Sequence, residues 1–428
     1  MFKVYRNSIG LALLFLVATV AVQAAPIQIT VMGGFPNTTP YGEVLYQYVD
    51  EYMKLNPNIE IVQLPRTGGD DTEMEKIYTS IAAGVAPDIV MVPQIFLTDY
   101  VAKRVVSPVP AAIQAKAKDA YLPAALFLGS YKNVLYGFPT EAQSQAIAYN
   151  SAVFAQYGYM DKAPSTWDEL RAMAKKMTVV NADGTYRTVG FGGPLYQTLQ
   201  AAWFLSFARS NGGDPLPADM SYVNFSRPES IAAAEYIRDM MQSKIAIQGR
   251  AGFAAGQMAM YLSPGSWHAA GYKNQGLGFF DGLRSAPLPV GSTGKSETTF
   301  YGYLWSVTPY TKNQTAAYDF LLWLCTSLTD RKTTRMGNVL EVQGNIPNTP
   351  WDAMNQPSFK HPFMKGFLEV VMNGSAKPIP PIPQWMASFG ELNTQATRIF
   401  TGEVSAAEGM ALVDKFIKEK MDEAKANL

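Results

Sequence analysis

Polar side chains and aromatic rings recur in the segments that follow the predicted strands of this chain. Side chains that donate and accept hydrogen bonds in fixed geometry suit a molecule with hydroxyl groups around its edge, and aromatic rings suit C–H patches on its faces. A sugar has both features, so these residue types together favour a carbohydrate site. The polar candidates are Asn37, Thr38, Gln94, Glu141 and Gln143, and the aromatic candidates are Tyr196, Trp267, Tyr301, Trp305 and Trp385.

Trp267 is the leading candidate, because it follows a Pro-Gly-Ser turn after an apolar segment that is predicted to be a strand. Arg66, beside Thr67-Gly68-Gly69, could clamp an anionic group. Plainer alternatives stay open at this stage. Glu141 and Arg66 could be solvated loop residues, Asn37 could cap a helix that begins near Pro40, and most of the aromatic residues belong in the core or on the surface.

Catalytic and metal-binding chemistry has little support in the sequence. His268 and His361 are the only histidines, and neither has a second metal ligand at the usual spacing or a Ser or Cys partner in view. The segment Gly276-Leu277-Gly278 lacks the third glycine of a dinucleotide loop, and no phosphate-binding loop ending in Gly-Lys-Ser/Thr occurs. We therefore expect no cofactor, no metal and no enzymatic activity. A secreted glycosidase, which needs only two carboxylates, is the enzymatic alternative.

The N-terminal segment predicts export. Lys3 and Arg6 precede an apolar run over 9–22, and Val22-Gln23-Ala24 offers the small residues of a cleavage site. We predict a signal peptide over 1–24 that is cleaved near Ala24, since the run is short for a membrane span. Without Lys3 and Arg6 the net charge is about −2, which gives no electrostatic reason to expect a nucleic-acid partner. The mature protein is expected in the periplasm and not to span the membrane.

Alternating strand and helix patterns must position the candidate residues. Segments 27–32, 59–64 and 89–92 predict strands, and the segments between them carry apolar residues at helical spacing. This βαβαβ opening predicts an α/β fold, and a chain of 428 residues is long enough for two lobes. In open α/β sheets, ligands bind beyond the carboxyl ends of the strands. The loops expected at the site are therefore 33–39, 93–96, 138–144, 193–197 and 263–268.

Later segments extend the same pattern. Ser165 and Thr166, with acidic residues three positions further on, have capping-box spacing ahead of a helix predicted over 167–177. The other features are a turn at 181–184, helices over 232–245, 315–324 and 405–426, and an extended proline-rich loop over 378–383.

Several short motifs occur in an order that few protein families share. IAAGVAPDIV at 81–90 is followed by GFPTE at 137–141, AYN at 148–150 and PSTWDEL at 164–170. The later motifs are FAAGQMAM at 253–260, GSW at 265–267, APLP at 286–289, FYGY at 300–303, IPQW at 382–385 and TGEVS at 401–405. This ordered set resembles family 1 of the bacterial extracellular solute-binding proteins, the family that includes maltose-binding protein.

The resemblance implies a two-lobed periplasmic-binding-protein fold of type II-like architecture, in which each lobe has a mixed, mainly parallel sheet flanked by helices and the cleft lies between the lobes. Lobe 1 would comprise 25–140 and 302–328, and lobe 2 would comprise 141–301 and 329–428. Trp267 matches a ligand-stacking position of the family, Trp385 lies near another cleft aromatic, and Tyr301 and Gly302 lie in the strand that returns to lobe 1. Segment 35–39 lacks the acidic and basic pair of maltose-binding protein, which argues against a maltose-like ligand.

The resemblance also implies a function. Such a protein captures a mono- or oligosaccharide, here expected to be neutral, and delivers it as a monomer to the permease subunits of an ABC importer. A polyol, a sugar phosphate or a polyamine is an alternative ligand, and ligand sensing for a membrane receptor is an alternative role.

Overall fold

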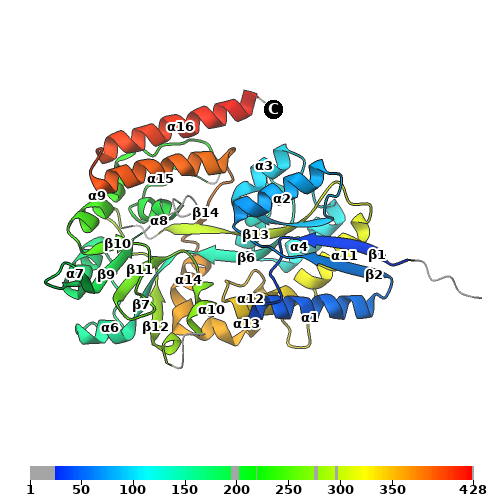
Figure 1. Cartoon of the computed structure of the whole chain (residues 1–428), viewed down its shortest axis with the longest axis horizontal. Helices are drawn as coiled ribbons and strands as arrows, with labels where there is room; N and C mark the ends of the chain where they lie inside the picture. Colours follow the sequence, from blue (N-terminus) through cyan, green and yellow to red (C-terminus); the bar gives the residue numbers. More distant parts are fainter. Residues whose placement is uncertain (1–24, 194–201, 218, 274–277, 295–296, 427–428) are drawn as a thin grey trace, which may run out of the picture.

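The computed structural model describes residues 25–193, 202–217, 219–273, 278–294 and 297–426. Within these ranges the molecule contains two six-stranded sheets that lie side by side, and helices flank each of them (Figure 1). The predicted signal peptide, its cleavage site near Ala24 and the candidate Tyr196 lie outside the described residues.

The first sheet contains the N-terminal strands. Its order is β14-β13-β3-β1-β2, and β6 also pairs with β13. The three opening strands are mutually parallel, as the βαβαβ pattern predicts, whereas β13 runs antiparallel to both β3 and β6. The strands are β1 (Ile27–Met32), β2 (Ile59–Leu64), β3 (Ile89–Pro93), β6 (Phe138–Ser144), β13 (Thr298–Val307) and β14 (Ala376–Pro378).

The second sheet has the order β10-β9-β11-β7-β12, with β8 paired to β9. The strands β9, β10 and β11 are parallel, and β7, β8 and β12 add antiparallel pairs. Both sheets are therefore mixed, with a parallel part in each. The strands are β7 (Ala146–Asn150), β8 (Val179–Val180), β9 (Tyr186–Gly193), β10 (Ala246–Gln248), β11 (Met258–Ser263) and β12 (Leu283–Ala286), and a separate hairpin is formed by β4 (Ser130–Tyr131) and β5 (Val134–Leu135).

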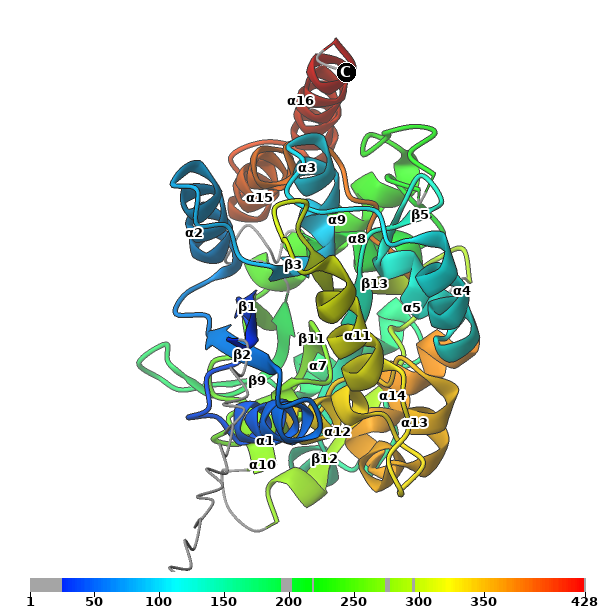
Figure 2. The same cartoon turned by 90° about the vertical axis from the view of Figure 1, so that its right-hand side faces the viewer.

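Helices cover the sheets, and the start of α15 lies beside α3, which flanks the first sheet (Figure 2). The rings of Trp385 and Phe96 make this contact, with their centroids 5.9 Å apart. None of the helices within the described ranges combines the length and the apolar character that a membrane span needs. Their bounds are α1 (Pro40–Leu55), α2 (Asp70–Ala82), α3 (Leu97–Ala102), α4 (Ala111–Ala120), α5 (Pro123–Leu128), α6 (Ser151–Gln156), α7 (Trp167–Met177), α8 (Ala202–Ser210), α9 (Pro228–Gln242), α10 (His268–Lys273), α11 (Gln314–Cys325), α12 (Arg335–Gln343), α13 (Pro350–Asn355), α14 (Pro362–Met372), α15 (Trp385–Thr401) and α16 (Ala406–Ala426), with short 3₁₀ turns η1 (Gln94–Phe96), η3 (Phe280–Gly282) and η4 (Pro357–Lys360).

Helix ends follow local chemistry. Thr166 caps α7 by accepting a hydrogen bond from the Glu169 amide at 3.1 Å, and the Glu169 carboxylate accepts one from the Ser165 amide at 2.8 Å. The predicted helix over 232–245 instead spans Pro228–Gln242. Proline fits the first helical turn, and Lys244 adopts a left-handed backbone (φ 57°) that ends the helix before β10.

The proline-rich segment begins as an edge strand. Pro378 is the last residue of β14, which pairs in parallel with the start of β13, and the chain then leaves the sheet without regular structure. Gln94 donates to the carbonyl of Ile379 at 2.8 Å, and Thr98 donates to that of Pro381. An edge position is where proline is tolerated, because it offers no amide hydrogen to the sheet.

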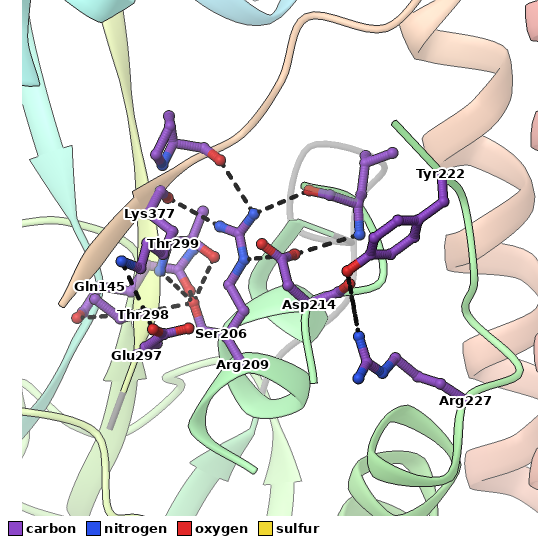
Figure 3. Close-up of polar contacts among 12 residues, drawn as sticks. Gln145, Ser206, Arg209, Asp214, Tyr222, Arg227, Glu297, Thr298, Thr299 and Lys377 are labelled. Atoms are coloured by element: carbon purple, nitrogen blue, oxygen red, sulfur yellow. Dashed lines mark hydrogen bonds and ion pairs between the residues drawn. The ribbon is translucent and has the colours of Figure 1, made fainter. Parts of the chain in front are cut away.

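Helix α8 holds the segments through which the chain passes from one sheet to the other (Figure 3). Ser206 donates to the Gln145 side chain at 2.6 Å, between β6 and β7, and accepts from the Thr299 amide at 3.1 Å, near the start of β13. Arg209 is fully buried and donates to the carbonyl of Lys377 at 2.9 Å, in β14. Helix α8 is thus hydrogen-bonded to three segments that connect the sheets: the β6–β7 connection, the start of β13 and the strand β14.

Candidate functional site

A cavity of about 650 Å³ lies between the two sheets. Residues that follow β1, β2 and β3 reach it from the first sheet, and residues that follow β11 reach it from the second. The carboxyl ends of parallel strands therefore open onto it, as expected for an open α/β sheet. Four of the five segments predicted as loops contribute lining residues, although 138–144 is the strand β6 and not a loop. The fifth, 193–197, lies almost entirely outside the described residues.

Seven of the twelve candidate residues line this cavity, and four described candidates do not. The seven are Arg66, Glu141, Gln143, Trp267, Tyr301, Gly302 and Trp385.

The four others have different positions. Asn37 and Thr38 are exposed, and the residue that caps α1 is Thr39, whose hydroxyl accepts from the Gly42 amide at 3.1 Å. Gln94 is buried, and its amide group points to the carbonyl of Ile379. Trp305 is buried in the apolar core of the first sheet.

An ion pair occupies the first-sheet wall of the cavity. The Arg66 guanidinium lies 2.7 Å from one carboxylate oxygen of Asp70, and the Tyr303 hydroxyl donates to the other oxygen at 2.8 Å. These contacts come from the loop before α2, the first turn of α2 and the strand β13. The positive charge of Arg66 is therefore compensated by Asp70 within the protein. The sequence left open that Arg66 binds an anionic group of a ligand, and this ion pair argues against that role.

Glu141 lies on β6 and is almost completely buried. One of its oxygens accepts hydrogen bonds from the side-chain amides of Gln343 at 3.2 Å and Asn345 at 3.3 Å. Burial raises the pKa of Glu141 to about 7, although the positive charge of Arg66 acts in the opposite direction. The carboxyl group is therefore near its titration point at neutral pH.

This raised pKa predicts a pH dependence of stability. Between pH 4.5 and 7 the unfolded chain has lost the Glu141 proton and the folded chain has kept it, so the free energy of unfolding falls as the pH rises through this window. We expect the contribution to be about 3 kcal/mol and to vanish in Glu141→Gln. Urea unfolding at several pH values measures it. Equal slopes for the wild type and Glu141→Gln would show that Glu141 has no such role.

Several polar atoms at the cavity have no partner among the described residues. They are the second carboxylate oxygen of Glu141, both side-chain polar atoms of Gln143 and the side-chain oxygen of Gln343. Buried polar groups in folded proteins are almost always hydrogen-bonded. Groups of this kind on one cavity wall suit a ligand that carries several donors and acceptors.

Aromatic rings supply the apolar part of the lining. Trp267 keeps 39% of its surface exposed, an unusual value for so large a ring, and it lies 4.1 Å from the His268 ring between centroids. Tyr301 donates to the carbonyl of Pro264 at 3.0 Å, which ties β13 to the loop after β11. Trp385 stacks on Phe389 at 4.2 Å between ring centroids and is fully buried behind the cavity wall. Trp267 is thus the most accessible aromatic surface here.

The sequence did not identify several lining residues. Tyr303 could have been found, because it lies two residues after Tyr301 and so shares its face of β13. Arg250 follows β10, which is parallel to β9, but no strand was predicted there from the sequence. Gln343 had no local signal, because it lies at the end of α12 and reaches the cavity only through tertiary packing. Within the ranges that the structure covers, no group of three or more His, Cys, Asp or Glu is placed to hold a metal ion.

Comparison with known proteins places this architecture in a family. The profile described as bacterial extracellular solute-binding protein matches residues 35–327. A binding protein of Brucella abortus (strain 2308) is 24% identical over 57% of this chain and 56% of its own length, so the match spans about half of that relative. The maltotriose-binding protein of Pyrococcus abyssi is 24% identical over 79% of this chain and 71% of its own length.

Solved structures agree on the fold. The GacH receptor of Streptomyces glaucescens, whose structure was determined without ligand and with acarbose, superposes with a TM-score of 0.76 at 21% identity. The match covers 94% of this chain and 100% of that one. A structural match at this low sequence identity establishes only the fold, whereas the profile match over residues 35–327 establishes the family. This chain belongs to the bacterial extracellular solute-binding proteins, with the two-domain fold of the maltose-binding-protein type.

Proposed function

We propose that this chain is the periplasmic substrate-binding component of an ABC importer, which captures a carbohydrate in the cavity between the sheets and delivers it to the membrane permease. The observation that carries the proposal is the pairing of unpartnered polar atoms on Glu141 and Gln143 with the exposed ring of Trp267 at one cavity. Sugar hydroxyl groups can form hydrogen bonds with the polar atoms of Glu141 and Gln143, and the C–H face of a sugar ring can pack on Trp267. Two similar proteins support the same ligand class, one named for maltotriose and one solved with acarbose.

We also propose that the two halves close on the ligand. The lining comes from both sheets, so a bound ligand contacts both and favours the arrangement in which they are close. The division into lobes at 25–140 with 302–328 and 141–301 with 329–428 stays a proposal. The packing of α12 against α1, in the apolar cluster of the first sheet, favours counting 335–343 with lobe 1.

Binding is a better fit than hydrolysis. Glycosidases need two carboxyl groups that act on the substrate. Asp70 and Glu141 both line the cavity, but Asp70 is held by Arg66 and Tyr303. Incubation with oligosaccharides is expected to leave them intact, and release of a shorter product would contradict this part of the proposal.

Removal of the exposed ring tests the proposed site. We expect Trp267→Ala to weaken binding by about 10-fold or more, because the variant loses stacking and buried area together. A thermal-shift screen with sugars, polyols, sugar phosphates and polyamines identifies the ligand class, since a ligand of the folded form raises the melting midpoint. Titration calorimetry then compares the wild type with Trp267→Ala.

Tyr310→Ala serves as the control, because Tyr310 is 46% exposed and does not line the cavity. Stabilisation by polyamines alone would overturn the carbohydrate proposal. Undiminished binding by Trp267→Ala would remove Trp267 from the site.

A further inference from the structure

A second cavity of about 650 Å³ adjoins the first. It lies between the loop that precedes α1, the helix α10 and the end of α12. The two cavities share part of their walls, so a ligand longer than one sugar ring could occupy both. The shared lining residues are Thr39, Tyr41, Arg250, Trp267, His268 and Gln343.

Arg250 lines both cavities and has no counter-charge within the described part of the chain. No carboxylate there forms an ion pair with it, whereas Arg66, the other arginine of the first cavity, lies 2.7 Å from Asp70. The Arg250 side chain is half-buried and makes one hydrogen bond within the described protein, from Nη1 to the Tyr272 hydroxyl at 3.2 Å. A guanidinium has five N–H donors, so most of them are available to a ligand.

A chain of buried polar groups holds Arg250 in place. The Tyr272 hydroxyl lies 2.9 Å from that of Tyr261, which lies 2.7 Å from Nδ1 of His268. Burial, reinforced by the positive charge of Arg250, holds the pKa of His268 well below its usual value. The imidazole is therefore neutral, and this network positions the guanidinium without neutralising it.

The second cavity has an excess of positive charge. Lys273 also lines it, at the end of α10. Glu341 is the acidic residue among the lining residues, and its carboxylate is already engaged, with Arg331 at 3.5 Å and with the Ser358 amide at 3.3 Å. Two cations and one carboxylate therefore line the cavity, and because the charge of Glu341 also acts on Lys273, Arg250 is the cation without a carboxylate beside it in the described part of the chain.

We propose that the ligand is an acidic saccharide, whose carboxylate or phosphate group binds Arg250 and Lys273 in the second cavity while a sugar ring packs on Trp267. The inference rests on the proposed carbohydrate-binding function and replaces the neutral sugar expected from the sequence. The planar fork of an arginine suits the oxygens of either group, and hydrogen bonds between charged partners are stronger than neutral ones. Trp267 lines both cavities, so it can contact the ring next to the acidic group.

The test compares acidic saccharides with neutral partners of the same shape. The probes are uronate-terminated oligosaccharides and their methyl esters, sugar phosphates and their dephosphorylated forms, and neutral mono- and oligosaccharides. Titration calorimetry at two salt concentrations measures binding to the wild type, Arg250→Gln and Arg250→Lys. Arg187→Gln is the matched control, because it removes the same charge at an exposed position of β9 that lines neither cavity.

We expect the wild type to prefer an acidic probe to its neutral partner by about 10-fold or more. Arg250→Gln should weaken binding of that probe by about 10–100-fold and leave its neutral partner almost unchanged, and Arg187→Gln should behave as the wild type. Added salt should weaken only the acidic probe. Preference for uronates or for phosphates identifies the source of the negative charge.

Two outcomes would overturn the inference. Neutral partners could bind as tightly as acidic probes, or Arg250→Gln could weaken both equally. In either case the carbohydrate-binding function stands and the acidic ligand fails. If no saccharide of any kind binds the wild type, the proposed function itself fails. If Arg250→Gln does not fold, Arg250→Lys replaces it: this variant keeps the charge and loses the fork, so it should bind the acidic probe more weakly than the wild type and the neutral partner equally well.

Discussion

Arg209→Met is expected to lower the free energy of unfolding by about 3 kcal/mol. The Arg209 side chain is fully buried and donates to the Asp214 carboxylate at 3.0 Å (Figure 3). It also donates to the carbonyls of Lys377 at 2.9 Å and Pro378 at 3.0 Å, which anchors β14 to α8. Methionine fills similar space but leaves these acceptors without a donor. Asp214 is 23% exposed and can regain water, so the loss should fall at the lower end of the range for broken buried pairs.

Urea unfolding measures the effect, and Arg238→Met provides the control. Arg238 pairs with the neighbouring Asp239 at 3.0 Å on the surface of α9, where an ion pair contributes about 1 kcal/mol or less. Arg209→Met should therefore unfold at a much lower urea concentration than Arg238→Met. Similar urea midpoints for the two variants would mean that the hydrogen bonds from Arg209 to β14 do not stabilise the fold.

Gly302→Ala is expected to destabilise the protein by up to about 3 kcal/mol and to weaken ligand binding as well. Gly302 lies on β13 opposite Ala142 of β6, and a Cβ atom at this position would lie 1.9 Å from the carbonyl oxygen of Glu141. That oxygen belongs to a strand backbone, so it cannot move aside as a flexible side chain could. The two strands must separate, which displaces Glu141 and Tyr303 from the cavity wall.

The control is Gly390→Ala. Gly390 lies inside α15, and an added Cβ there would meet no atom within 4 Å. Alanine is the better helix former by about 1 kcal/mol, so this variant should be as stable as the wild type or slightly more stable. Thermal unfolding of the two variants and titration of each with the ligand identified in the screen give the comparison. A Gly302→Ala protein with unchanged stability and affinity would contradict the close approach of β6 and β13.

Local patterns accounted well for the elements near the N-terminus. The strands β1, β2 and β3 have the predicted positions, and α1 begins at Pro40 and α7 at Trp167 as the capping and proline signals indicate. These signals act over a few residues, so one stretch of sequence contains all the information. The same locality explains the error at α9, where the apolar pattern continued past the residue that ends the helix.

Site residues in loops after strands were also accessible to sequence reasoning. Trp267 lines the cavity because the carboxyl ends of parallel strands meet there, whereas Glu141 and Gln143 reach it from within β6, which runs antiparallel to β13. Asn37, Thr38 and Gln94 satisfied the same rule and do not line the cavity, and Trp305, which was proposed only as an aromatic residue, is buried in the core. A loop assignment does not determine which way each side chain points, because that depends on neighbours from other parts of the chain.

The fold class, the family and most of the segments that open onto the cavity follow from local pattern and motif order, so they could be inferred from the sequence alone. The charge state of the site depends on tertiary packing. Asp70 compensates Arg66, Gln343 and Asn345 contact Glu141 from some 200 residues away, and Arg250 has no counter-charge among the residues that the structure describes. Electrostatic energies depend on distance in space and on burial, and neither quantity is encoded in spacing along the chain.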